Sequence, residues 1–342
     1  MPRTLGRRDF LKLGGAGLLA SAFPYGATVA SDRAIFLGRI ISNQYIFDRP
    51  TEESDRLVKL KADDVINVYE KLTLPDQLPY DRNWFRTDGG YVNAATVQPV
   101  QRRVNRPLTE IPATGLLGEI TVPFADARWY PGNDAPIAYR LYYATTYWIK
   151  GRVAGDAGSV WYKLWDDLLK DYYYVPGITV RPISTSELTP LSPGVADKRI
   201  EVNLTRQTVE AFEGERSVLK VPTSTGRMFP RADGGWDDFR TPAGEFIIQR
   251  KRASRHMAAT DLVASDGYDL PGVPWVSYIL WWGISFHGTY WHNDFGRAHS
   301  HGCINLRPED AKWVFRWSLP VAPYGEEYVV GPGTKVISFV EE

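Results

Sequence analysis

The first half of the chain contains a pattern of short strands that occurs twice. Trp84 and Trp161 each begin a predicted strand, and Pro99 and Pro182 stand near the ends of the two copies. Self-similarity at an interval of roughly 80 residues indicates two copies of one small supersecondary unit. The chain is therefore expected to fold as two small β-modules followed by a separate region.

The composition favours a mainly β protein that has no nucleic-acid partner. The 342 residues include 30 Gly, 24 Pro and 12 Trp, and 13% of them are aromatic. Frequent Gly and Pro keep helices short, and aromatic residues favour strands. The 40 basic and 40 acidic residues give a formal net charge of +0. No global field therefore attracts nucleic acid or an acidic membrane surface.

The N-terminus carries the features of an export signal. Arg7 and Arg8 precede a mildly apolar stretch that is too short to span a bilayer well, and small residues lead up to Ala30. This order is typical of a twin-arginine signal over residues 1–30 with cleavage after Ala30. An uncleaved anchor is the alternative. Either reading predicts that the working part of the protein lies outside the cytoplasm, in a bacterial cell envelope.

The recurring strand pattern resembles bacterial Src-homology-3-like modules of cell-wall proteins. In each copy a Trp begins a strand, and a Tyr-Val stretch closes the unit. The alternative is a pair of unrelated sheets. Exposed aromatic side chains in such modules could bind cell-wall glycan or peptide, although most of the aromatic residues are expected in the core. The predicted parts after the signal are the first module 31–105, the second module 112–185, a linker 186–197 and a last domain 198–340.

The last domain is also predicted to be β-rich, with one short helix. Pro308 suits the first turn of a helix in which Ala311, Phe315 and Leu319 share one face. Between Arg252 and Gly272 the periodicity disappears, and Gly, Asp, Ser and Pro become frequent. This stretch predicts an irregular loop of about twenty residues, a length that usually indicates a functional lid.

A short run near the C-terminus, residues 284–311, holds four of the five histidines and the one cysteine of the chain. Cys303 cannot form an internal disulfide, so it is a reactive thiol, a metal ligand or a small buried residue. Gly302 permits close backbone approach, and the following residues lead into the helix at Pro308. The sequence therefore predicts a thiol close to helix-terminal amides, which would lower its pKa and offer N–H donors to an oxyanion.

Metal binding is the second chemistry that this run allows. His287, His292, His299, His301 and Cys303 are all ligand types. However, the step from His287 to His292 is one residue longer than the step that aligns two ligands on a helix, and no second cysteine completes a structural zinc set. A site made of His299, His301 and Cys303 remains open, and with it a zinc-dependent envelope hydrolase. His292 and His299 are otherwise expected to be surface or hydrogen-bonded histidines.

The run "HGTYWHNDFGRAHSHGCINL" resembles the signature of L,D-transpeptidase catalytic domains. The signature consists of His-Gly, then Ser-His-Gly-Cys, then Asn shortly after the cysteine. The interval between His287 and Cys303 falls within the range found in that family. Segments at 224–226, 241–246 and 271–275 also resemble family elements, in the same order. The resemblance extends over most of residues 198–340 and implies the β-rich fold of that domain.

The resemblance implies a nucleophile and a base. Cys303 would attack a peptide carbonyl, and His287, held by a backbone carbonyl at Gly288, would take its proton. Main-chain N–H groups around Gly302 and Cys303 would bind the oxyanion, and His301 is a rival for the base. The signature residues expected to frame this pair are Gly288, Ser300, His301, Gly302 and Asn305.

The implied reaction is acyl transfer between peptidoglycan stem peptides, with release of a terminal D-alanine and a thioester on Cys303. Attack by water instead of an amine would make the protein an L,D-carboxypeptidase. A wall-binding protein with an inactive catalytic domain is a further alternative. The predicted partners are donor and acceptor stem peptides, with cell-wall glycan as a ligand of the modules. No cofactor motif is present, so no cofactor is expected, and carbapenems are expected to acylate Cys303.

Overall fold

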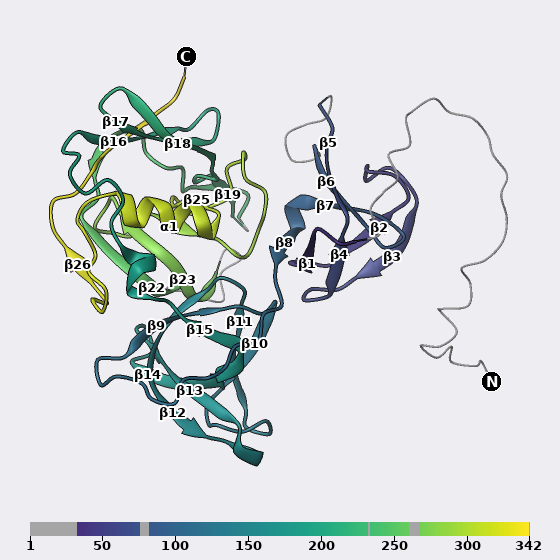
Figure 1. The fold of residues 1–342 in the computed structure, drawn as a ribbon. Coiled ribbons are helices and arrows are strands. Elements are labelled where there is room, and N and C mark those ends of the chain that lie inside the picture. The colour runs from purple at the N-terminus through teal and green to yellow at the C-terminus, as the bar shows by residue number, and fades with distance from the viewer. Residues whose placement is uncertain (1–32, 76–81, 232, 260–266, 342) are drawn as a thin grey trace. The chain divides into compact units, whose positions relative to one another are not determined.

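The computed structural model of the chain describes residues 33–75, 82–231, 233–259 and 267–341. The signal predicted over residues 1–30 lies outside them. Across these ranges the protein is mainly β, as the composition predicts, with a single α-helix in the last domain (Figure 1). No helix in the described ranges is long and apolar enough to cross a membrane.

The first module consists of two small antiparallel sheets, with strand orders β4-β1-β8 and β3-β2-β7-β6-β5. Apolar side chains from both sheets, including Ile40, Phe85 and Val97, form one buried cluster. The strands are β1 Phe36–Ile40, β2 Gln44–Phe47, β3 Arg56–Leu60, β4 Val65–Val68, β5 Glu70–Thr73, β6 Asn83–Thr87, β7 Gly90–Asn93 and β8 Val97–Val100.

The second module forms one seven-stranded sheet with the order β11-β10-β14-β13-β12-β9-β15. Its own buried cluster contains Leu141, Tyr147 and Tyr173. The strands are β9 Leu116–Ile120, β10 Phe124–Arg128, β11 Ile137–Tyr142, β12 Thr146–Ala154, β13 Val160–Asp166, β14 Asp171–Pro176 and β15 Val180–Pro182.

The two modules share one pattern of strand pairing. β1 pairs with β4 and β8 as β9 pairs with β12 and β15, and β2 pairs with β3 and β7 as β10 pairs with β11 and β14. β12 corresponds to β4 and β5 together, which are separated at Tyr69. Trp84 and Trp161 lie on equivalent strands and are both buried. The internal repeat seen in the sequence is therefore a repeat of topology. The Src-homology-3-like assignment stays a prediction.

The last domain has two five-stranded sheets, β18-β17-β16-β27-β21 and β25-β24-β23-β22-β26. Side chains from both sheets and from α1 form the largest buried cluster of the described residues. The elements are β16 Lys198–Asn203, β17 Thr208–Glu213, β18 Arg216–Pro222, β19 Met228–Pro230, β20 Trp236–Asp238, β21 Gly244–Ile247, β22 Arg250–Ala258, β23 Asp269–Tyr278, β24 Ser285–Gly288, β25 Ile304–Leu306, α1 Pro308–Trp317, β26 Val329–Val330 and β27 Lys335–Phe339.

The helix after the cysteine begins at Pro308, as predicted, but it ends at Trp317, before the last residue of the predicted apolar face. Ala311 and Phe315 are buried against the sheets. Leu319 lies beyond the helix and is 36% exposed, so its place on that face was wrong. Pro320 explains this early end, because a proline disfavours the helical conformation of the residue before it.

The irregular loop predicted from Arg252 to Gly272 is wrong for most of the residues that the structure describes there. β22 continues to Ala258 and pairs in antiparallel fashion with β23, which begins at Asp269. Polar residues on the buried face of β22 disguised its alternation. Lys251 is fully buried and donates to the carbonyls of Phe315 and Ser318, and His256 is buried between carboxylates. Buried polar groups of this kind are tolerated because they are hydrogen-bonded.

The turn between β13 and β14 of the second module contacts the β22–β23 hairpin through two carboxylates. Asp166 Oδ2 lies 2.8 Å from His256 Nδ1. Asp167 accepts from the His256 backbone N–H at 2.9 Å and forms ion pairs with Arg252 and Arg255. Since other residues of this hairpin line the cavity that contains Cys303, the second module supports one wall of that cavity.

Candidate active site

Two parallel strands bring the histidine and the cysteine of the signature together. β24 and β25 pair Phe286 with Ile304, and both of these side chains are fully buried in the domain core. Successive side chains of a strand point to opposite faces. His287, the next residue of β24, and Cys303, the residue before β25, therefore face away from that core. Both line one cavity of about 310 Å³, called the catalytic cavity from here on.

His287 is held as a neutral imidazole. It is 2% exposed, and its Nδ1 lies 3.2 Å from the carbonyl oxygen of Gly288. A carbonyl can only accept, so Nδ1 carries the proton and Nε2 keeps its lone pair. Burial lowers the pKa of His287 to about 4, against the smaller opposing effect of the Gly288 carbonyl. At neutral pH the imidazole can therefore accept a proton through Nε2.

Burial raises the pKa of the Cys303 thiol, and Ser285 opposes this effect only in part. The sulfur lies 3.7 Å from Ser285 Oγ and 3.7 Å from the Gly283 carbonyl oxygen. The predicted lowering of the thiol pKa by helix-terminal amides was wrong, because β25 separates Cys303 from the helix at Pro308. The Cys303 thiol therefore rests protonated, in the same cavity as the neutral His287.

Ser285 was missed in the sequence, although a signal for it exists. It stands two residues before His287 on the same strand, and side chains at i and i+2 share a face of a sheet. Its side chain is fully buried beside the sulfur. Reading the alternation of Ser285, Phe286 and His287 outward from the predicted base would have placed it at the site.

Ser300 and Gly302, two predicted supporting residues, form the turn that presents Cys303. Ser300 Oγ donates to the Cys303 carbonyl oxygen at 2.5 Å and accepts from the Gly302 N–H at 3.1 Å. Gly302 has φ +110°, a conformation that side-chain-bearing residues rarely adopt. The sequence predicted the Gly302 N–H as an oxyanion donor, but this N–H already donates to Ser300 Oγ. The Cys303 N–H is the remaining candidate of the predicted pair.

The Ser-Thr-Gly segment at 224–226 packs directly against this turn. Gly226 forms a parallel bridge with Ser300, and a Cβ at Gly226 would lie 2.7 Å from the Gly302 Cα atom. Thr241 Oγ1 accepts from the Gly226 N–H and donates to the Gly302 carbonyl. Gly288 is constrained in a similar way, since a Cβ there would lie 2.7 Å from Pro274 Cγ. Gly226 and Gly288 are therefore positions where neighbouring atoms leave no room for a side chain.

Asn305 and His292 form a buried pair behind His287. Asn305 is the register partner of His287, and its side-chain amide lies 2.9 Å from His292 Nε2. The backbone N–H of Asp294 donates to His292 Nδ1 at 3.2 Å. Burial holds the pKa of His292 well below its usual value. His292 is therefore the hydrogen-bonded histidine that one sequence reading expected, and it braces Asn305.

The other two histidines of the run have different surroundings. His299 pairs with Asp294 at 3.2 Å and stacks on His292 with ring centroids 4.7 Å apart. His301 stacks on Phe229 at 4.0 Å and lines the catalytic cavity. Across the described ranges, no three His, Cys, Asp or Glu side chains are arranged to hold a metal ion. Aromatic packing thus accounts for the position of His301 in the site.

Half of the remaining wall of the cavity comes from the stretch 252–272, which the sequence singled out as a functional segment although not as a hairpin. The Trp291 ring lies 5.5 Å from the His287 ring. Trp291 lies inside the signature run and could have been found there, whereas Arg227 and Phe229 lie on a distant segment that has no local signal. These wall residues are Arg227, Phe229, Met257, Tyr268, Leu270 and Trp291.

Comparison with known proteins gives one matching family. Residues 197–337 match the YkuD family model, described as the L,D-transpeptidase catalytic domain. L,D-transpeptidase 1 of Mycobacterium tuberculosis is 37% identical over 81 residues, which cover 22% of this chain and 32% of that protein. The Bacillus subtilis protein YciB is 29% identical over 126 residues, which cover 34% of this chain and 58% of that protein. The chain thus spans less than two thirds of the length of these relatives.

A solved structure of an L,D-transpeptidase from Mycobacterium smegmatis is also similar. It is 19% identical, covers 72% of this chain and 92% of that chain, and has a TM-score of 0.33. This overall agreement is too low to identify the two modules that precede the catalytic domain.

Proposed function

Because residues 197–337 match the L,D-transpeptidase catalytic domain, we propose that this protein is an exported cysteine L,D-transpeptidase that cross-links peptidoglycan stem peptides. Cys303 is the nucleophile and His287 the general base. The observation that carries the proposal is the shared cavity of these two side chains, with Nδ1 of His287 engaged by the Gly288 carbonyl and Nε2 left to accept a proton.

The shifted pKa values of this pair oppose proton transfer in the resting enzyme, so the proton moves only as the sulfur attacks. A thiol with a raised pKa and an imidazole with a pKa of about 4 rest as a neutral pair. Nε2 takes the thiol proton as the sulfur attacks the donor carbonyl, and the Cys303 N–H donates to the oxyanion. The C–N bond to the terminal D-alanine then breaks, and the leaving amine takes the proton from the imidazolium. A thioester on Cys303 remains.

The second half-reaction decides between the two acyl-transfer activities. An amine of a second stem attacks the thioester in transpeptidation, whereas water attacks it in carboxypeptidation. The proposal assigns the amine as the main acceptor. Export through the twin-arginine-type signal and attachment to wall glycan through Src-homology-3-like modules complete the proposal, since both bring the enzyme to its polymeric substrate.

Acylation of Cys303 tests the proposal directly. Incubation of the purified full chain with a carbapenem should add one drug mass, and Cys303→Ala should remove the adduct. Intact-mass spectrometry measures both. A wild-type chain that keeps its mass would overturn the assignment of the nucleophile.

The reaction products distinguish the alternatives. Incubation with a disaccharide tetrapeptide should give cross-linked dimers, and chromatography of the products separates these from shortened monomers. Shortened monomers alone would identify a carboxypeptidase. Activity that is lost on chelation and restored by zinc would instead favour the envelope hydrolase.

A further inference from the structure

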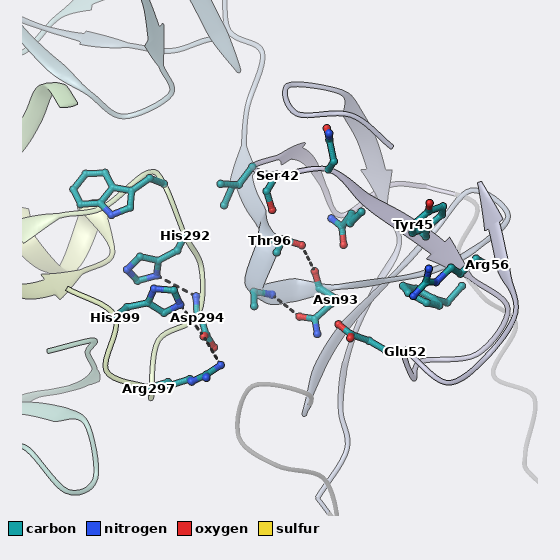
Figure 2. Close-up of a pocket in the computed structure, with 16 residues that line it drawn as sticks. Ser42, Tyr45, Glu52, Arg56, Asn93, Thr96, His292, Asp294, Arg297 and His299 are labelled. Carbon is teal, nitrogen blue, oxygen red and sulfur yellow. Dashed lines mark hydrogen bonds and ion pairs between the residues drawn. The ribbon is translucent and has the colours of Figure 1, made fainter. Parts of the chain in front are cut away.

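A second cavity, of about 470 Å³, lies between the first module and the loop that follows β24 (Figure 2). We call residues 291–299 the shared loop, because both of its ends line this cavity and the catalytic cavity. The first module contributes β2 and its surroundings to one side of the second cavity, and the shared loop contributes the other. The charged and aromatic residues that define the cavity chemically are Tyr45, Glu52, Arg56, Asp294, Arg297 and His299.

The shared loop is fixed at both sides. The backbone N–H of Asn293 donates to the Ala95 carbonyl of the first module at 2.8 Å, and its side-chain amide donates to the Ala94 carbonyl at 3.1 Å. On the catalytic side, Ser224 Oγ donates to the Asp294 carbonyl at 2.8 Å. Hydrogen bonds on both sides therefore hold the shared loop, and with it one wall of the cavity, in place.

A buried arginine holds the first module against the residue just before the loop. Arg39 is 2% exposed, donates to the Tyr290 carbonyl at 2.7 Å and forms an ion pair with Asp63 at 2.9 Å. Its guanidinium lies 4.0 Å from the ring centroid of Tyr142 in the second module. All three parts of the chain thus meet where the shared loop begins.

The shared loop leads from the second cavity to the base. Trp291 and His299 line both cavities, and the Trp291 ring lies 5.5 Å from the ring of His287. A chain that leaves the second cavity along these two side chains therefore enters the catalytic cavity on the side of the base.

The cavity has the chemistry of a site for a peptide that carries an amino sugar. Tyr45 supplies an aromatic ring and a hydroxyl group, and the guanidinium of Arg56 lies over one face of this ring, 4.9 Å from its centroid. Glu52 and Arg56 of the first module supply both signs of charge. On the shared loop, Asp294 is already paired with His299 at 3.2 Å and with Arg297 at 3.8 Å. Such a mixture suits a polar ligand that has hydroxyls, amides, an amine and carboxylates.

We propose that this cavity binds the acceptor strand of peptidoglycan, at the end of the stem that bears the sugar; this inference rests on the proposed function. In the transfer step, the acceptor amine forms a C–N bond to the thioester carbon while the C–S bond breaks. The amine proton passes to His287 Nε2 and then to the Cys303 sulfur. The leaving amine and the attacking amine use the same base, so by microscopic reversibility they occupy the same position.

The leaving amine and the attacking amine differ in size, and this difference assigns the second cavity to the acceptor. The leaving D-alanine is a single residue and is accommodated near His287. The acceptor continues into a whole stem and its sugar. Trp291, whose ring lies 5.5 Å from the His287 ring, also lines the second cavity, and this places the second cavity next to the base. The donor stem instead extends from the acyl side of Cys303 and does not need this path.

Separate donor and acceptor probes test the assignment on the full chain. The donor is a stem tetrapeptide with its side-chain amine acetylated, and the acceptor is a disaccharide tripeptide that lacks the terminal D-alanine. Tyr45→Ala and Arg56→Gln should each raise the acceptor KM about tenfold, as expected for loss of about 1.4 kcal/mol of binding. Donor acylation and donor hydrolysis without acceptor should stay unchanged.

Exposed positions outside the cavity provide matched controls. Tyr130→Ala and Arg216→Gln change side chains that are mostly exposed and do not line either cavity, so the acceptor KM should stay as in the wild type. An unchanged acceptor KM in both cavity variants would overturn the inference. Donor acylation that falls together with cross-linking would also overturn it, because the cavity would then serve the donor.

A sugar-free acceptor tests which end of the strand occupies the cavity. With the bare tripeptide as acceptor, Tyr45→Ala and Arg56→Gln should have no effect, since the sugar that they contact is missing. An undiminished effect of these variants would overturn the placement of the sugar. Failure of the proposed function is distinguishable from all these outcomes, since the wild-type chain would then form no acyl-enzyme with the donor.

Discussion

His287 and His256 are buried to nearly the same extent, but their pKa values are shifted in opposite directions. They are 2% and 3% exposed. At His287, burial lowers the pKa to about 4, and only the hydrogen bond to the Gly288 carbonyl opposes this effect. At His256 burial again opposes the charge, but Asp166 on Nδ1 and Asp269 on Nε2 outweigh it and raise the pKa. The partners of a buried histidine, rather than burial itself, decide its charge.

The difference separates the base that we propose from a histidine that joins two parts of the structure. A neutral imidazole can accept a proton from a thiol, so the active-site strand keeps carboxylates away from His287. A charged imidazole can join two carboxylates, so His256 connects the second module to the β22–β23 hairpin. Tyr139 also packs edge-on against His256, with ring centroids 5.3 Å apart, and its own pKa is raised to about 12 by burial and by the same carboxylates.

The two histidines also make the stability of the fold depend on pH in opposite directions. The lowered pKa of His287 means that the unfolded chain binds a proton below about pH 6.5 while the folded chain does not, so stability falls from there to about pH 4. The raised pKa of His256 gives a contribution that is complete below about pH 6.5 and is lost as pH rises through the folded value.

Replacement of His287 should have the largest effect and would test the catalytic half of this comparison. His287→Ala should lower the acylation rate of Cys303 by about 10² to 10⁴, as expected for loss of a general base. Time-resolved intact-mass spectrometry with a carbapenem measures this rate. His301→Ala is the control and should cost much less, because its ring is held by aromatic packing. The opposite order would assign the base to His301.

The pH dependence of the wild-type acylation rate tests whether His287 acts as a neutral base. Because the pKa of His287 is about 4, the rate should hold from neutral pH down to about pH 5 and fall near pH 4. A midpoint near the ordinary histidine value of about 6.5 would contradict a neutral buried base.

Replacement of His256 should have the next largest effect and would test the assembly half. His256→Gln should lower the free energy of unfolding by about 3 kcal/mol, since it leaves a buried carboxylate at Asp166 without its charged partner. This loss is at the lower end of the range for breaking a buried ion pair, because Asp269, the second partner of His256, is 36% exposed. Chemical denaturation at pH 6 and pH 9 measures it.

The loss caused by His256→Gln should shrink at the higher pH, because the wild-type histidine is then losing its proton. A difference that stays constant between the two pH values would contradict a charged His256. Carbapenem acylation at saturating drug should stay close to wild type, which separates this joint from the catalytic pair.

Replacement of Ser285 should have the smallest effect. Ser285→Ala removes a hydroxyl 3.7 Å from the sulfur, so the pKa of the Cys303 thiol should rise further, by less than about one unit or about 1.4 kcal/mol. The pH dependence of alkylation by iodoacetamide measures the shift. Ser217→Ala, at an exposed position of β18, is the control. A fall in the thiol pKa would show that Ser285 does not stabilise the thiolate.

Much of the fold was predictable because it depends on local patterns. The repeat of Trp-headed strands predicted two modules, and these have matching strand pairings. The start of the helix followed from Pro308. The β22–β23 hairpin was missed because its inward-facing residues, Lys251 and His256, are polar. Such residues look like a loop until the carbonyls and carboxylates that bind them are known.

By itself the sequence determined that His287 and Cys303 belong to one site, because the signature spacing and the glycines around it are local properties of the chain. Only the tertiary structure decided that the imidazole and the thiol are both neutral, that Ser285 lies beside the sulfur and that the ends of the loop 291–299 line both the site and the cavity next to the first module. Burial and charge depend on residues far away in sequence, and no local pattern contains them.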